Sequence, residues 1–208
     1  MEKTTTHRIK KTTTYRIAVY ALFTAIIAIC AQLLIPTAPV PITLGLFAIL
    51  LVGALLGEKH SLVPVAVYIA IGLIGIPVFA GFKGGFSVLL GYTGGYVVGY
   101  LFTAFLTGLG IKLLRKKFGE KIWIYPVPMI VGVLACYLLG SAWVMLYFHR
   151  TLADTLKLCV TPFIIGDAIK IVFATVIAWR LKPLLKRELE KFFDVTVTPP
   201  PSQTDSEV

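Results

Sequence analysis

The sequence predicts an all-α integral membrane protein, a bundle of six transmembrane helices. First, 57% of its 208 residues are hydrophobic, only 14% are charged, and the mean hydropathy is +0.86. A soluble domain carries about 25% charged residues. Second, the apolar residues form runs close to the roughly 20 residues that a helix needs to cross a bilayer. These features exclude a soluble, fibrous or disulfide-stapled protein.

Six apolar stretches account for the expected helices in order. The first also has the basic start and apolar core of a signal peptide, but five more stretches follow, so we expect it to be retained. The second is short for a complete span, so it must tilt or begin in the preceding loop. The expected spans are 17–35, 42–56, 62–79, 92–111, 122–148 and 160–181.

The distribution of Lys and Arg predicts that both termini are cytoplasmic. Sixteen of the 20 lie in the N-terminal arm, after the second and fourth stretches, or at and beyond the end of the sixth. The positive-inside rule assigns these segments to the cytoplasm, and an even number of spans agrees. We therefore expect a basic cytoplasmic arm (1–16), a six-helix membrane domain (17–194) and a Pro-rich, disordered tail (195–208), in a multi-pass protein of the cell membrane.

Several functional classes are not expected. The formal charge of +10 is explained by topology, so no nucleic acid is predicted as a partner. Cys30, Cys136 and Cys159 lack the paired spacing of disulfides or metal sites. Neither a catalytic motif nor a nucleotide-binding loop occurs, so we expect no enzyme and no cofactor. Any ATP would act only through partner subunits.

Two unusual loops are expected on the outer side. One, IPTAPVPITLG, contains three prolines, and the other carries six glycines between Gly81 and Gly95. Irregular backbone at membrane depth is tolerated only where it is buried in protein or lines a cavity. The loops therefore suggest a covered pocket that opens outward, although two ordinary surface turns would give the same pattern.

Asp167 and Lys170 are the only ionisable residues well inside an expected span. A charge near the bilayer centre costs roughly 2.5–3.5 kcal/mol, so such residues pair or face a cavity. Their i, i+3 spacing places them on one helical face, in the outer half of the membrane. They form either an internal salt bridge or a site for a small, mostly apolar ligand with amide-like groups or an acid.

Small residues mark the helix faces that can pack closely. Ala18, Ala21, Ala25 and Ala28 follow one face of the first span. This face either docks on a partner helix or contacts the chain's own bundle. For the Gly91, Gly95 and Gly99 series, and for the Gly53 and Gly57 pair, we expect packing within the bundle.

Four stretches together resemble the BioY family, the biotin-specific substrate-binding (S) components of energy-coupling factor (ECF) transporters. They are AQLLIPTAPVPITL, then GLIGIPVFAGFKGG with LLGYTGGYVVGY, then YLLGSAWV, and finally TPFIIGDAIK. The resemblance implies a six-helix bundle that captures biotin from outside. It also implies a transmembrane coupling subunit and two ATPase subunits as partners. An S component for another vitamin, or an intramembrane enzyme, is the alternative.

The resemblance also implies binding residues. Asp167 and Lys170 match the aspartate and lysine of the family's GDxxK segment. Asp167 would accept the ureido N–H groups of biotin, and Lys170 would support that head group or meet a ligand oxygen. The first-helix stripe from Ala18 to Ala28 matches the face on which S components dock. The other candidates in the matching stretches are Thr43, Phe79, Gly84, Tyr92, Tyr96 and Trp143.

Overall fold

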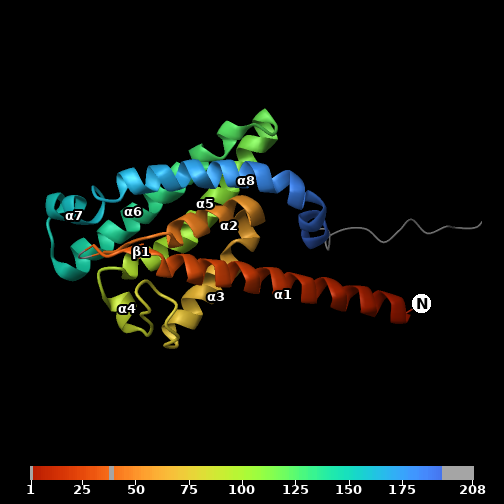
Figure 1. Cartoon of the computed structure of the whole chain (residues 1–208), viewed down its shortest axis with the longest axis horizontal. Helices are drawn as coiled ribbons and strands as arrows, with labels where there is room; N and C mark the ends of the chain where they lie inside the picture. Colours follow the sequence, from red (N-terminus) through yellow and green to blue (C-terminus); the bar gives the residue numbers. More distant parts are fainter. Residues whose placement is uncertain (1, 38–39, 194–208) are drawn as a thin grey trace, which may run out of the picture.

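The computed structural model describes residues 2–37 and 40–193, with side chains described for residues 14–37 and 40–184. The described chain is mostly helical (Figure 1). Its elements are α1 (Glu2–Gln32), β1 (Leu34–Ile35), β2 (Ile42–Thr43), α2 (Gly45–His60), α3 (Leu62–Leu73), α4 (Ser87–Leu90), α5 (Gly94–Phe118), the 3-10 helix η1 (Ile122–Ile124), α6 (Pro126–Phe148), α7 (Leu152–Cys159) and α8 (Ile164–Phe193).

Three described helical segments are long and apolar enough to cross a membrane by themselves. They are Thr14–Gln32, Gly94–Phe118 and Ile122–Phe148. Two helix pairs pass the same test only together, α2 with α3, bent by 111°, and α7 with α8, bent by 51°. The described residues thus hold three to five candidate spans, which confirms a helical membrane protein and leaves the count of six as a prediction.

The α2–α3 pair shows why the lengths of the helices alone do not give six spans. With 16 and 12 residues, these helices are about 24 and 18 Å long at 1.5 Å per residue. Both are shorter than the roughly 30 Å hydrocarbon core. Gly57 breaks α2 near its end, where its φ is +77°. A residue with a Cβ rarely adopts this backbone conformation.

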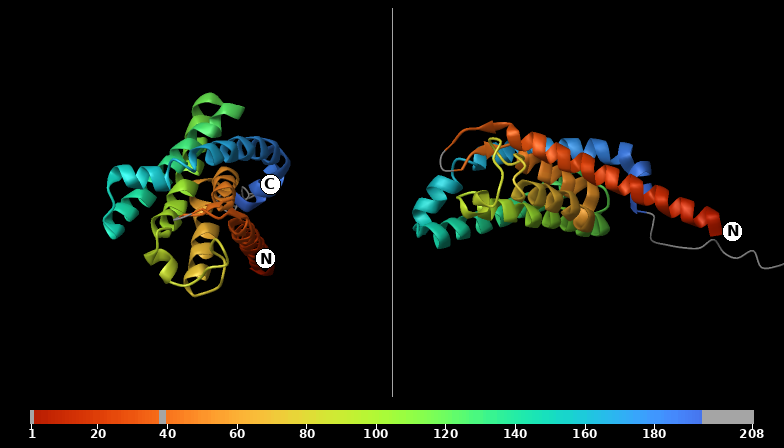
Figure 2. Two further views of the ribbon diagram at one scale, coloured as in Figure 1. Left: turned by 60° about the vertical axis from the view of Figure 1, so that its left-hand side comes forward. Right: turned by 90° about the horizontal axis from the view of Figure 1, so that it is seen from below.

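The two described chain ends lie at the same end of the bundle (Figures 1 and 2). Residues 2–16, predicted as a separate arm, are helical and continuous with the first span. The last helix begins at Ile164 rather than at residue 160, and the short α7 precedes it. The predicted tail, 195–208, lies outside the described residues.

Glycines bring α5 into close contact with its neighbours. A Cβ on Gly53 would lie 2.7 Å from the backbone oxygen of Ala104, and one on Gly99 would lie 2.9 Å from the Cys136 sulfur. Gly95 would clash in the same way with Trp143. Packing within the bundle is therefore confirmed for these three glycines. Gly57 packs as well, because a Cβ on Gly108 of α5 would lie 2.5 Å from the Gly57 backbone. A Cβ on Gly91 would meet only its own loop, and its contact with α6 is the hydrogen bond that its backbone oxygen accepts from Trp143.

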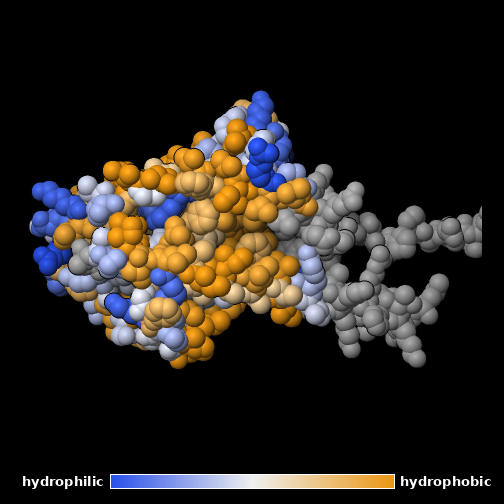
Figure 3. All heavy atoms as spheres, viewed as in Figure 1, coloured by the Kyte–Doolittle hydropathy of each residue, from blue (hydrophilic) through white to orange (hydrophobic). Residues whose placement is uncertain are grey.

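The surface agrees with membrane embedding. Hydrophobic residues cover most of the middle of the molecule, and hydrophilic residues gather at its left-hand end and at the tip that projects at the top of the view (Figure 3). Large apolar side chains such as Leu138, Leu146 and Phe173 are exposed. Such an apolar surface is expected where lipid tails replace water.

Candidate ligand-binding site

Asp167 and Lys170 form a buried ion pair at the start of α8. Lys170 Nζ donates to Asp167 Oδ1 at 2.7 Å, and the hydroxyl of Tyr137 on α6 donates to Asp167 Oδ2. Both charged side chains are almost fully buried. The first-turn position of Asp167 also places its carboxylate at the positive end of the helix dipole. The two residues are therefore paired, as their i, i+3 spacing allows, and their role in binding a ligand stays a prediction.

A cavity of about 110 Å³ lies beside this pair. One water needs roughly 10–15 Å³ of such volume, so the space exceeds what a few waters fill. Its walls combine aromatic and aliphatic side chains with a few polar groups, the usual character of a small-molecule site. The lining residues are Ala31, Val40, Pro41, Thr43, Leu46, Tyr68, Phe79, Ala80, Lys83, Val88, Thr93, Tyr96, Val97, Tyr100, Cys136, Tyr137, Phe163, Asp167 and Lys170.

Both unusual loops cover this cavity. The proline-rich loop is framed by the β1–β2 ribbon, in which Leu34 pairs with Thr43 and Ile35 with Ile42. In the glycine-rich loop, the backbones of Phe79 and Lys83 exchange hydrogen bonds of 2.9 and 3.2 Å, and both residues line the cavity. The loops are therefore part of the site rather than plain surface turns.

Gln32, the last residue of α1, fastens the glycine-rich loop. Its side-chain amide donates to the backbone oxygens of Val78 at 2.9 Å and Phe79 at 3.2 Å, and its Oε1 accepts from the Phe82 N–H at 2.9 Å. One side chain thus satisfies three backbone groups of a segment more than 40 residues away. Sequence reasoning missed this residue, because nothing local marks such a long-range contact.

Five of the predicted binding residues meet at the cavity: Thr43, Phe79, Tyr96, Asp167 and Lys170. Thr43 Oγ1 accepts from the Gly45 N–H at 3.2 Å, which orients its side chain at the start of α2. The Tyr96 hydroxyl donates to the Cys159 backbone oxygen at 2.6 Å, so Tyr96 presents its ring to the cavity.

The other three predicted residues lie behind the described lining. The Tyr92 ring stacks on Phe148 with centroids 3.7 Å apart. The Trp143 indole N–H donates to the Gly91 backbone oxygen at 3.1 Å. Gly84 packs against the Gly75–Ile76 turn, where an added Cβ would lie 2.6 Å from a backbone oxygen. These residues support the loops, and a direct role in binding stays a prediction.

The cavity also contains aromatic residues that the sequence did not single out. Tyr100 lies four positions after Tyr96, so a shared helical face could have identified it. Tyr137 and Phe163 reach the site from α6 and from the turn before α8, and no spacing pattern links them to Asp167.

The alanine stripe of α1 faces largely away from the bundle. Ala18, Ala21 and Ala25 are exposed and Ala28 is half-buried, whereas Thr24 and Ile27 are buried. Packing against the chain's own helices is therefore wrong for most of this face. Docking on a partner stays a prediction.

Comparisons with known proteins agree with one another. Residues 2–187 match the BioY family. The chain is 40% identical to a Thermotoga maritima protein named biotin transporter BioY, over 78% of this chain and 93% of the relative. It is 35% identical to a biotin transporter BioY of Lactococcus lactis, over 83% of this chain and 90% of the relative.

A solved structure is also similar. It is the S component for biotin from an ECF-type ABC transporter, with a TM-score of 0.76, 33% identity, and coverage of 82% of this chain and 92% of that one. All three similar proteins are transport proteins, which confirms the prediction that the chain is not an enzyme. The chain belongs to the BioY family.

Proposed function

We propose that this protein is the biotin-binding S component of an ECF transporter and captures biotin from outside the cell membrane. The buried Asp167–Lys170 pair beside a covered cavity carries the proposal. A salt bridge this deep offers little stability by itself, because desolvation offsets the attraction between its charges. Binding of a ligand with complementary donors and acceptors would explain why the pair is buried.

The chemistry of biotin matches the walls of the cavity. Its ureido ring offers two N–H donors and a carbonyl, and its thioether ring and chain are apolar. Each carboxylate oxygen accepts more than one hydrogen bond, so Asp167 can bind ureido N–H groups while it holds Lys170 and Tyr137. Lys170 then supports the ligand's head group or meets one of its oxygens. The rings of Phe79 and Tyr96 supply apolar contact.

The same proposal includes six membrane passes with both termini in the cytoplasm. A change of direction of 111° between α2 and α3 sends the chain back across the bundle, so this pair works as a short hairpin of two passes. Tilting and local bilayer thinning accommodate such short helices at modest cost. The glycine-rich loop and the cavity then face outward.

Partner subunits complete the proposed transport cycle. The exposed Ala18, Ala21 and Ala25 let another helix approach α1 closely, as small residues do in membranes. The proposed partners are a transmembrane coupling subunit and two ATPases, which would supply the energy. No cofactor of its own and no nucleic acid is needed.

A calorimetric titration of detergent-purified protein against a panel of vitamins tests this function. We expect saturable binding of biotin at nanomolar to low micromolar concentration, and no heat from the other vitamins. Tight binding of a different vitamin would keep the S-component role and overturn the choice of ligand. The absence of binding by any vitamin to folded protein would overturn the proposal.

A further inference from the structure

A second cavity lies at the opposite end of the same three helices. It has a volume of about 1090 Å³ and is lined by the late residues of α2, α5 and α8, whereas the ligand-binding cavity is lined by their early residues. On α8, for example, Lys170 lines the first cavity and Lys182 the second. Twelve residues of helix separate them, about 18 Å at 1.5 Å per residue.

This cavity has an apolar wall and a basic rim. Its exposed apolar wall consists of Trp179, Pro183 and Leu184 of α8, and its lining also includes apolar residues of α2 and α5 that are buried. The Lys and Arg residues in the described lining are Lys59, Lys112, Arg115, Arg180 and Lys182. A basic rim above apolar walls is complementary to an amphiphile with an anionic head.

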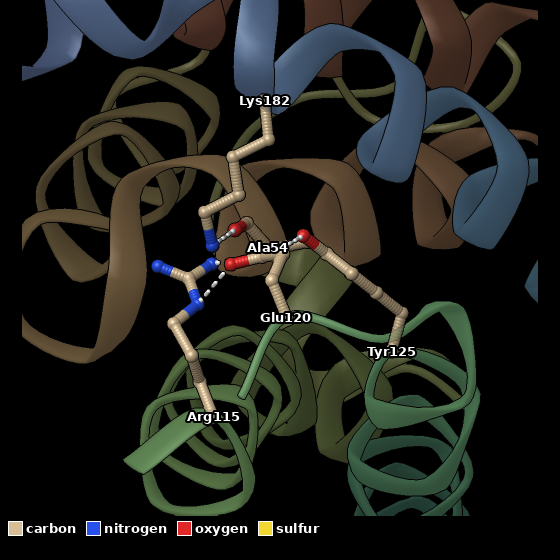
Figure 4. A network of polar contacts seen from close by, with 5 residues as sticks. All are labelled: Ala54, Arg115, Glu120, Tyr125 and Lys182. Carbon is tan, nitrogen blue, oxygen red and sulfur yellow. Dashed lines mark hydrogen bonds and ion pairs between the residues drawn. The ribbon is translucent and has the colours of Figure 1, made fainter. Parts of the chain in front are cut away.

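The two carboxylates in the lining neutralise only part of this charge. Glu58 is paired with Lys112, and Glu120 is paired with Arg115, with Arg115 Nε 2.7 Å from Glu120 Oε2. Figure 4 shows the second pair together with the Tyr125 hydroxyl, which also donates to Glu120.

Three cations remain without a carboxylate within 4.0 Å among the described side chains: Lys59, Arg180 and Lys182. Lys182 Nζ donates to the Ala54 backbone oxygen at 3.2 Å and lies 5.5 Å from the centre of the Tyr125 ring (Figure 4). The half-buried Lys182 is thus held by a carbonyl and a ring, and the nearby Glu120 carboxylate, already paired with Arg115, balances its charge only from beyond 4.0 Å.

Trp179 indicates that this cavity lies near the depth of lipid headgroups. Trp179 lines it and is 37% exposed, and the Arg180 guanidinium lies 5.4 Å from the Trp179 ring centre. Tryptophan concentrates at the interface between membrane and water. The cations therefore lie where lipid phosphates run, and the apolar wall lies where acyl chains begin.

We propose that this cavity binds the anionic headgroup of a phospholipid. Arg180 and Lys182, with Lys59 at the rim, donate charge-assisted hydrogen bonds to the phosphate, and the upper acyl chain covers the apolar wall. Basic pockets between membrane helices on the cytoplasmic side bind acidic lipids in this manner. The apolar wall favours a lipid over a free phosphate ion, for which a purely polar site would suffice.

Tryptophan fluorescence in phosphatidylcholine nanodiscs tests the site. The probe is phosphatidylglycerol with brominated acyl chains, which quenches Trp179 when it occupies the cavity. Brominated phosphatidylcholine measures non-specific contact, and Trp179→Phe identifies the signal. We expect quenching by phosphatidylglycerol at a concentration at least tenfold lower than by phosphatidylcholine. Equal quenching by the two lipids would overturn the proposal.

Matched variants separate this site from general charge effects. Arg180→Gln with Lys182→Gln should reduce the apparent affinity for phosphatidylglycerol at least tenfold. Lys116→Gln with Lys117→Gln removes the same charge from the same end, outside the described lining, and should leave the affinity unchanged. Lys182 also donates to the Ala54 backbone, so the double variant could fail to fold. The single variant Arg180→Gln keeps this contact, and its affinity for phosphatidylglycerol should fall at least threefold.

A competition experiment distinguishes a lipid phosphate from a free phosphate ion as the ligand of this cavity. Inorganic phosphate at millimolar concentration should not displace the brominated phosphatidylglycerol. Displacement by inorganic phosphate would show a small-anion site and overturn the lipid assignment. Unchanged affinity in both Arg180 variants would overturn the site itself.

Discussion

The Asp167 side chain is buried, charged and hydrogen-bonded to two neighbours. Lys170 balances its charge, and Tyr137 occupies its second oxygen. Removing one partner of a buried pair is costly, because the remaining charge loses its compensation. The side chain is thus fixed in orientation before a ligand arrives, which lowers the entropy cost of binding.

Tyr137→Phe tests the contribution of the phenol to this arrangement. Hydrogen bonds to charged groups contribute about 1.5–3 kcal/mol. At the lower end of that range, the scaling of soluble domains gives a melting temperature lower by roughly 3–6 °C. Thermal unfolding in detergent measures the change. The control is Tyr147→Phe on the same helix, where the ring is exposed, and equal shifts in both variants would contradict the assigned role.

At the scale of the elements, α1 joins two functions that the sequence presented separately. Its exposed alanine face is the proposed docking surface, and its last residue, Gln32, holds the loop that carries Phe79 and Lys83. If a partner docks on α1 as proposed, a movement of the helix would therefore reach a wall of the ligand cavity through Gln32.

Gln32→Leu should loosen the glycine-rich loop without filling the cavity, because the Leu side chain is shorter than that of Gln and makes no hydrogen bonds. Three backbone groups lose a partner, so we expect biotin to dissociate at least fivefold faster. Stopped-flow exchange of labelled for unlabelled biotin measures this rate. Leu22→Ala, at an exposed position of α1, is the control. An unchanged dissociation rate in Gln32→Leu would show that the loop is held by other contacts.

The elements also show how far a sequence determines this fold. Hydropathy predicted helices close to α1, α5 and α6, because each is a single long apolar run. It also predicted a short second helix, which α2 confirms, but it extended the third to residue 79, whereas α3 ends at Leu73. The break at Gly57 was not predicted, since it depends on a backbone angle rather than on polarity. Asp167 and Lys170 were found because a buried charge is conspicuous. Tyr137 was not, since only the packing of α6 on α8 brings it to Asp167.

At the scale of the whole molecule, the bundle has two chemically different ends. One encloses an ion pair beneath two loops, and the other presents a basic rim around a wide cavity. The exposed face of α1 runs between them. The proposed capture of biotin at one end and the proposed docking along the side should therefore be separable by substitution.

Ala21→Leu with Ala25→Leu tests this separation. The larger side chains should prevent close approach of a partner helix, while the distant cavity keeps its shape. Biotin binding should stay within twofold of wild type, and recovery of the coupling subunit in a pull-down should fall at least fivefold. Ala66→Leu with Ala70→Leu is the matched control, since both alanines are exposed on α3. Normal recovery of the complex would contradict docking on α1.

The buried carboxylate of Asp167 is proposed to receive the ligand, and calorimetry of Asp167→Asn with biotin tests this role most directly. Loss of a charged acceptor should weaken binding by at least about 1.5 kcal/mol, more than tenfold in affinity. Asp154→Asn, an exposed acid on α7, should leave affinity unchanged. Wild-type affinity in a folded Asp167→Asn variant would contradict the account.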